Sequence, residues 1–364
     1  MHKTSAWPLA LVYTALVVYA SLYPFADWRD QGIAAWAFLA APLPKYWTGF
    51  DVMANVLGYA PLGFLLALSA LRTGKVPSPI AVASVAAGLL SLVMEGLQSY
   101  LPSRVPSNVD WVLNVGGAFA GAVSAALLER LGALDRWGRF RERWFVADAR
   151  GALVLLALWP VALLFPPAVP LSLGQVLERV ELALAEALSD TPFLEWLPMR
   201  EVEMQPLVPG VELLCVVLGA LVPCLLGFCV VRSLPKRAVF IGAIFSVGIG
   251  ATVLSAAMSY GPGHAWAWLN LPVRVGLTVA LVLAILMLPL PRRGCAALVL
   301  LGLVLHLSLL NQAPTSAYFA QTLQTWEQGR FIRFHGLVQW LGWLWPYAAL
   351  AYVVHRVSRR ETNA

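Results

Sequence analysis

The sequence predicts an all-α integral membrane protein, a polytopic bundle of about ten transmembrane helices. Of its 364 residues, 60% are hydrophobic and only 12% are charged, whereas a soluble globular protein carries roughly 25% charged residues. So little charge cannot cover a water-facing surface of this size, and the outer surface must largely face lipid. The apolar residues also gather in stretches of about 20, the length that crosses a bilayer.

Ten such stretches are interpreted as membrane spans. Several prolines lie in the fifth and sixth stretches, and neighbouring helices can accommodate them at the cost of kinks. The first stretch could be a cleaved signal peptide, but its length favours a retained helix. The expected spans are Ala6–Tyr23, Val52–Leu71, Ile80–Tyr100, Trp111–Leu131, Ala152–Leu171, Val211–Val231, Ala238–Tyr260, Leu271–Leu290, Cys295–Asn311 and Gly336–His355.

Lysine and arginine residues indicate which side of the membrane each connection faces. With a cytoplasmic amino terminus, most of the basic residues fall in inner connections, as expected for a multi-pass membrane protein. The carboxyl terminus is then cytoplasmic too. The net charge of +6 therefore reports topology, and we expect no nucleic-acid partner.

A basic segment divides the chain at residues 132–149. Trp137, Phe140 and Trp144 follow one another at i, i+3 and i+7, which predicts an aromatic face on a basic helix. Such a helix is expected to lie on the anionic inner leaflet, although a solvated linker remains an alternative. We therefore expect a four-helix transmembrane unit (residues 1–131), this interfacial linker, and a six-helix transmembrane extension (residues 150–364).

The connection of residues 172–208 is long and acidic, and it faces outward in this topology. Its apolar residues form a stripe on one side, which predicts an amphipathic helix packed on the outer surface. The glutamates are interpreted as a solvated face. The stripe consists of Val176, Leu177, Val180, Leu184 and Leu188.

Polar side chains in the first four spans gather toward the outer side. A charged group in a span costs about 2.5–3.5 kcal/mol on insertion scales, which makes these residues functional candidates. A short hairpin joins spans three and four, so their outer ends are adjacent, and span two reaches the same depth. The sequence therefore predicts an outward-open polar pocket with the ligand-binding residues Asp51, Asn55, Glu95, Gln98, Arg104, Asp110 and Asn114.

Each of these residues also has a structural alternative. Asp51 and Asp110 could be helix N-caps, and the two asparagines could form interhelical hydrogen bonds. Arg104 could be a charge at the rim or the ion-pair partner of Glu95. Glu95 is the hardest to explain structurally, because a carboxylate within a span needs a partner or a raised pKa.

Two small residues continue the polar stripe of span four. Gly117 and Gly121 are four residues apart and share one helix face. This spacing predicts that the backbone of another helix approaches span four closely.

The spacing of the polar residues resembles the signature of the VanZ-like membrane proteins. The resemblance covers about residues 1–131, and the six further spans are a departure from members that are little more than the four-helix unit. It implies a multi-pass protein of the bacterial cytoplasmic (inner) membrane, a cell-envelope role and, through the family's namesake, low-level resistance to the antibiotic teicoplanin. The motif reads Asp51-x-x-x-Asn55, Tyr59, Pro61-Leu62-Gly63-Phe64, Glu95-x-x-Gln98, Pro102-x-Arg104, Ser107-x-x-Asp110 and Asn114-x-x-Gly117.

Three classes of function remain open. A binding or accessory protein would use the pocket to recognise a headgroup. An intramembrane enzyme would use Glu95 or Asp110 as general base, while Arg104 steadies developing charge. A transporter would need a polar stripe that continues to the cytoplasmic side of the membrane. Spans two to four become apolar toward that side, which disfavours a transporter.

The expected partners are membrane lipids and, as candidate ligand, a lipid-linked cell-wall intermediate. We expect no cofactor and no metal, because the sequence holds no glycine-rich phosphate loop and its histidines lack metal-ligand spacing. The four cysteines form no CxxC pair and are interpreted as small buried residues. They are Cys215, Cys224, Cys229 and Cys295.

Overall fold

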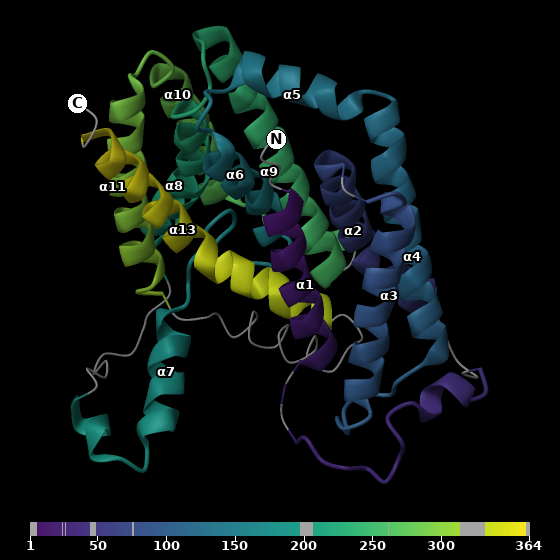
Figure 1. Ribbon diagram of the computed structural model, residues 1–364. Helices are drawn as coiled ribbons and strands as arrows, with labels where there is room; N and C mark the ends of the chain where they lie inside the picture. The colour runs from purple at the N-terminus through teal and green to yellow at the C-terminus, as the bar shows by residue number, and fades with distance from the viewer. Residues whose placement is uncertain are drawn as a thin grey trace. The chain divides into compact units, whose positions relative to one another are not determined.

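The computed structural model describes residues 6–23, 25, 27–43, 49–74, 76–196, 207–260, 262–313 and 332–361 (Figure 1). Within these ranges the regular elements are all helices, and one isolated β-bridge joins Phe145 to Val231. The chain divides into two compact units, an amino-terminal unit (Met1–Arg139) and a carboxy-terminal unit (Phe140–Ala364). The boundary falls inside α5 (Ala133–Trp144).

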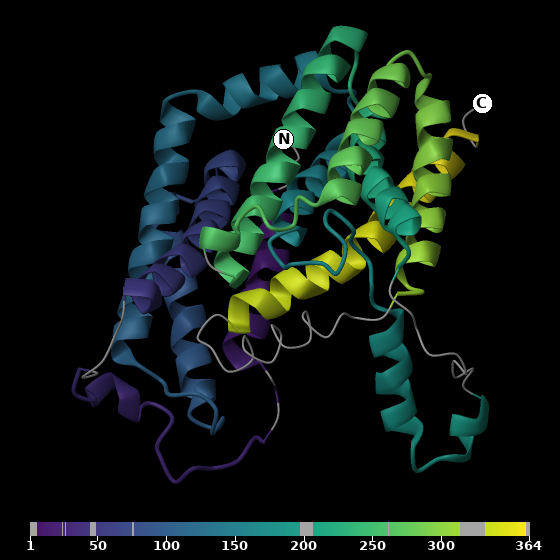
Figure 2. The same ribbon diagram turned by 180° about the vertical axis from the view of Figure 1, so that it is seen from behind.

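Four long helices build the amino-terminal unit. Helices α2 and α4 pack against each other most extensively, α3 packs against both, and α1 lies against α2 and α3. Figures 1 and 2 show α2, α3 and α4 running alongside one another. The elements are α1 (Ala6–Leu22), η1 (Ala37–Ala40), α2 (Gly49–Thr73), α3 (Pro79–Gln98) and α4 (Asn108–Arg130).

Glycines bring α2 and α4 into backbone contact. A Cβ atom on Gly117 would overlap the carbonyl oxygen of Val56, and one on Gly121 would overlap that of Ala60. Gly63 on α2 meets the backbone of α4 in the same way. The prediction of a close helix approach at Gly117 and Gly121 is therefore confirmed, and the approaching helix is α2.

The carboxy-terminal unit is built around α8. From Cys215 to Phe228 every residue of this helix is buried, and α6, α9, α10 and α11 pack around it. Its elements are α6 (Arg150–Ala162), α7 (Leu177–Leu188), η2 (Pro192–Trp196), α8 (Pro209–Phe228), α9 (Leu234–Tyr260), η3 (Pro262–His264), α10 (Leu271–Leu286), α11 (Arg292–Leu310) and α13 (Ile332–Glu361).

The fifth expected span is wrong in its second half. Helix α6 ends at Ala162, and residues 163–176 form an irregular and mostly buried segment, here called the buried loop. Pro166, Pro167 and Pro170 explain the difference, because proline lacks the N–H that a helix interior needs and its ring clashes with the preceding turn. Three prolines so close together end the helix instead of kinking it.

The apolar helices match the expected spans in position. Six of the described helices, α2, α3, α4, α8, α9 and α11, are long and apolar enough to cross a membrane, while α1, α6 and α10 are apolar but shorter. The count of ten spans remains a prediction. So does the cytoplasmic position of both termini, since residues 1–5 and 362–364 lie outside the described part of the chain.

Both amphipathic helices expected outside the spans are present. Helix α5 carries the aromatic residues of the basic segment, and Trp137 and Phe140 are exposed on it. Helix α7 coincides with the apolar stripe of the acidic connection, and none of its residues is buried. Helix formation is thus confirmed in both segments, while their contact with a membrane surface stays a prediction.

Candidate functional site

A chain of hydrogen bonds links three helices of the amino-terminal unit. The Nδ2 atom of Asn55 on α2 donates to Oδ1 of Asp110 on α4 at 3.0 Å. The backbone N–H of Asp110 donates to Oγ of Ser107 at 3.3 Å. The backbone N–H of Ser107 in turn donates to Oε2 of Glu95 on α3 at 2.9 Å. The buried carboxylate of Glu95 therefore helps to fix the start of α4.

Asp110 is not the N-cap of α4, so that alternative is wrong. Ser107 takes the N-cap position, because a serine hydroxyl accepts readily from the N–H groups of a first helical turn. Asp110 lies within that turn, where the helix dipole favours a carboxylate. Asp51 occupies the first turn of α2 and interacts electrostatically with Asp110. The two carboxylates are therefore neighbours.

A second polar contact lies one turn further along α4. Nδ2 of Asn114 donates to Oγ of Ser91 on α3 at 3.0 Å, and both residues are buried. The prediction of an interhelical hydrogen bond by Asn114 is confirmed. However, Oδ1 of Asn114 has no hydrogen-bond partner in the described structure, and neither has the hydroxyl of Tyr59. The Tyr59 hydroxyl lies close to Ser91, Ser21 and Glu95, but none of these contacts has the geometry of a hydrogen bond, so polar groups with unused hydrogen-bonding capacity meet inside the unit.

Leaving such groups unpaired is costly. A buried donor or acceptor without a partner costs about 1–3 kcal/mol, and most proteins avoid it. We call the residues gathered around these groups the polar cluster, and they come from α2, α3 and α4. The polar cluster consists of Asp51, Asn55, Tyr59, Ser91, Glu95, Asp110 and Asn114.

Gln98 and Arg104 bind the end of α1 instead. Arg104 donates from Nε to the carbonyl oxygen of Tyr23 at 3.1 Å and from Nη2 to that of Ala20 at 3.2 Å. Gln98 donates from Nε2 to the carbonyl oxygen of Ser21 at 2.9 Å. The last carbonyl groups of a helix have no partner within the helix, and α1 has no basic residue in its last turn. The two side chains supply the missing donors.

The alternative of an ion pair between Glu95 and Arg104 is wrong. Both side chains are buried and described, yet no ion pair within 4.0 Å joins them. Arg104 directs its guanidinium to carbonyl oxygens, while Glu95 accepts a backbone N–H of the helix hairpin. The positive charge expected in the pocket is therefore used in holding α1.

Sequence reasoning missed Tyr59 as a member of the site. It follows Asn55 by one helical turn, so the two share a face of α2. A tyrosine hydroxyl usually finds a partner when it is buried, and this one does not. The spacing from Asn55 was the signal that could have identified it.

The segment between α1 and α2 is fixed beside the polar cluster. The backbone N–H of Arg29 donates to the carbonyl oxygen of Tyr100 at 3.0 Å. Nε2 of Gln31 donates to that of Ser99 at 2.8 Å. Residues 27–43 therefore lie against the carboxyl end of α3. An outward-open pocket stays a prediction.

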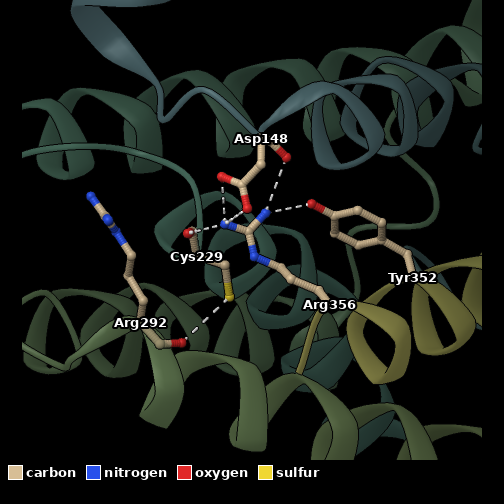
Figure 3. A network of polar contacts seen from close by, with 5 residues as sticks. All are labelled: Asp148, Cys229, Arg292, Tyr352 and Arg356. Carbon is tan, nitrogen blue, oxygen red and sulfur yellow. Dashed lines mark hydrogen bonds and ion pairs between the residues drawn. The ribbon is translucent and has the colours of Figure 1, made fainter. Parts of the chain in front are cut away.

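A further polar network, in the carboxy-terminal unit, holds helix ends together (Figure 3). Arg356 on α13 lies 3.1 Å from a carboxylate oxygen of Asp148. It donates to the hydroxyl of Tyr352 at 2.7 Å and to the carbonyl oxygen of Cys229 at 3.5 Å. The buried guanidinium thus ties α13 to the end of α8 and to the turn before α6. The four cysteines are buried and form no disulfide, and their burial was expected.

A comparison with protein families finds a match in the amino-terminal unit. Residues 5–129 match the model of the VanZ/LLP1 family, whereas no curated protein and no solved structure matches the chain. The matched stretch contains α2, α3 and α4, three of the helices able to cross a membrane. Residues 5–129 are therefore similar to the VanZ/LLP1 family, and the long apolar helices of the described chain are those of a membrane protein.

Proposed function

We propose that the protein serves the bacterial cell envelope from the cytoplasmic membrane, where the polar cluster binds the headgroup of a lipid-linked cell-wall intermediate from the outer side. The observation that carries this proposal is the pair of buried, unpartnered atoms, the Tyr59 hydroxyl and Oδ1 of Asn114. A bound headgroup would supply the partners that these atoms lack. The phenotype expected from the VanZ resemblance is low-level tolerance of teicoplanin.

The charges of the polar cluster favour one kind of headgroup. Asp51, Glu95 and Asp110 contribute carboxylates, which accept hydrogen bonds and donate none when ionised. Arg104 is engaged with the carbonyl oxygens of α1. The cluster therefore suits a group that donates hydrogen bonds through hydroxyl, amide or amino groups, and it disfavours a bare anion.

Teicoplanin tolerance tests the proposal. The chain is expressed in a teicoplanin-susceptible bacterium, and the lowest concentration that stops growth is measured. Wild-type protein is expected to raise this concentration, whereas Tyr59→Phe and Glu95→Gln are expected to abolish the rise at an unchanged membrane level. Tyr100→Phe, which removes the same atom from an exposed side chain, and Glu186→Gln on the exposed α7 are the matched controls. Full tolerance in both cluster variants would refute the proposal.

A second candidate, an intramembrane enzyme, rests on the neighbouring carboxylates. Asp110 interacts with Asp51 and is oriented by the amide of Asn55. Paired carboxylates can divide the roles of acid and base. If Glu95→Gln or Asp110→Asn still binds a labelled lipid-linked intermediate but no longer converts it, the enzyme is the better account. If both variants lose binding, the binding or accessory role is the better account.

A further inference from the structure

The end of α5 is joined to the turn between α8 and α9. A β-bridge pairs Phe145 with Val231, and the backbone N–H of Arg232 donates to the carbonyl oxygen of Trp144 at 3.0 Å. Nε of Arg232 also donates to the carbonyl oxygen of Phe145 at 2.7 Å. These bonds hold the two segments in a fixed position within the carboxy-terminal unit.

Four basic side chains gather where the two segments meet. Nζ of Lys236, in the first turn of α9, donates to the carbonyl oxygen of Arg143, whose own side chain is exposed in the last turn of α5. The carboxyl end of a helix attracts cations, which explains why basic residues of the α8–α9 turn stay beside the end of α5. We call this group the basic corner, and it consists of Arg141, Arg143, Arg232 and Lys236.

Neighbouring groups do not offset the charge of the basic corner. Glu142 is the one acidic residue in the last turns of α5, and helical spacing places it opposite the aromatic side of that helix. Asp148 is engaged by Arg356, with a carboxylate oxygen 3.1 Å from the guanidinium. Arg237, which follows Lys236, is buried and donates to backbone carbonyl oxygens. The corner therefore presents more positive than negative charge, while Arg237 serves the fold.

An aromatic surface borders the basic corner. The ring centroids of Phe140 and Trp144 lie 5.2 Å apart, and 39% of Phe140 is exposed. The corner also lies where α8 ends and α9 begins, and both helices are long and apolar enough to cross a membrane. A connection between two spans meets the bilayer at the depth of the headgroups, where aromatic rings also prefer to lie. Cations and rings at this depth suit a lipid phosphate and its acyl chains together.

We propose that the basic corner binds the phosphate of an anionic phospholipid. The guanidinium groups of Arg141 and Arg143 would form charge-assisted hydrogen bonds to the phosphate oxygens, and the acyl chains would pack on the rings of Phe140 and Trp144. A zwitterionic lipid is a weaker ligand, because its own ammonium group offsets the phosphate charge. The site lies in the carboxy-terminal unit and is independent of the function proposed for the polar cluster.

Native mass spectrometry of the full-length protein tests the site. The purified protein, in a neutral detergent, receives equal amounts of phosphatidylglycerol and phosphatidylcholine, and the lipids that it retains are counted. Wild-type protein is expected to retain phosphatidylglycerol in preference. Arg141→Gln combined with Arg143→Gln should lower this retention by about tenfold or more. Arg29→Gln combined with Arg274→Gln, two exposed arginines outside the corner, is the matched control and should match wild type.

Thermal unfolding separates lipid binding from folding. Without added lipid both double variants should unfold at the wild-type midpoint, because substitutions of surface side chains rarely change stability. Phosphatidylglycerol should raise the midpoint of the wild type and of the control, but not that of the corner variant. Equal retention of the two lipids by the wild type, or wild-type retention by the corner variant, would overturn the proposal. Displacement of phosphatidylglycerol by a soluble acidic peptide at equal concentration would also overturn it.

Discussion

The two units bury polar groups in opposite ways. In the amino-terminal unit the helices are regular, and side chains such as Tyr59 and Asn114 bring polar atoms inside without pairing all of them. In the carboxy-terminal unit the backbone itself leaves the helix after Ala162, and Asn311 supplies its partners. In the polar cluster, unpaired side-chain atoms are available to a ligand, whereas Asn311 is used to hold the backbone; Ser172, whose hydroxyl is unpaired, is an exception in the second unit. Substitution of Tyr59 or Asn114 should therefore harm function, and substitution of Asn311 should harm stability.

The largest effect is expected where α2 and α4 touch. Gly121→Val places a side chain against the carbonyl oxygen of Ala60, and backbone cannot yield as a flexible side chain can. We expect a loss of about 3 kcal/mol or more in the free energy of unfolding. Gly116→Ala is the matched control, since no atom lies within 4 Å of its added Cβ. Equal thermal stability and equal hydrogen exchange of α2 in the two variants would contradict the close packing.

The next largest effect is expected at Asn311, which holds the buried loop. Asn311→Ala removes the partner of two backbone N–H groups and one of two donors to the Gly174 carbonyl, and each buried group left unpaired costs about 1–3 kcal/mol. Hydrogen exchange should accelerate across residues 163–177 and stay unchanged in α2 and α4. The neighbouring, exposed Gln312→Ala serves as control. Unchanged exchange in the loop would show that Asn311 does not hold it.

A smaller effect is expected at the end of α1. Arg104→Lys keeps the charge but loses the forked geometry that reaches two carbonyl oxygens. We expect about 1–2 kcal/mol of destabilisation, seen as faster hydrogen exchange in the last turn of α1. Arg29→Lys changes an exposed arginine nearby in sequence and should have no such effect. If instead Arg104→Lys loosened the start of α4 alone, an ion pair with Glu95 would be the better account.

The sequence specified the helices of the amino-terminal unit well. Clear helix-start signals precede its apolar runs, such as Pro79 at the start of α3 and Ser107 before α4. The spacing of Gly117 and Gly121 indicated a close helix contact. This spacing could not identify α2 as the contacting helix, because a face of small residues fits any neighbouring helix.

The buried loop was harder to predict. Residues 163–171 are as apolar as a span, so hydropathy extended α6 through them, although the three prolines were a warning. The side-chain amide of Asn311, which holds the loop, lies far along the chain, directly after the end of α11. A pairing over such a separation has no signal in local sequence.

Helical spacing anticipated several contacts among the candidate residues. Asn55 and Asp110 meet, and Asn114 pairs across to α3. The hydrogen-bond partner of each side chain was less predictable. Arg104 was expected near a carboxylate, but the unpaired carbonyl groups at the end of α1 compete for the same donor. Spacing fixes the face of a helix, whereas rotamers and neighbouring helix ends decide the contact.

The smallest loss of stability is expected at Tyr59. Tyr59→Phe removes a buried hydroxyl that has no partner, so the free energy of unfolding should stay the same or rise. Thermal unfolding of the two proteins in the same detergent measures this. A clear loss of stability would mean that the hydroxyl is bonded within the fold, and the contrast between the units would fail.

The central claim is that a bound group pairs with the unpartnered atoms of the polar cluster. Density inside the polar cluster tests this claim most directly. A cryo-electron microscopy map of the full-length protein in bacterial membrane lipids should show a bound group within about 3.2 Å of both the Tyr59 hydroxyl and Oδ1 of Asn114. A map in which these two atoms bond to each other or to the surrounding helices, with no additional density, would contradict the account.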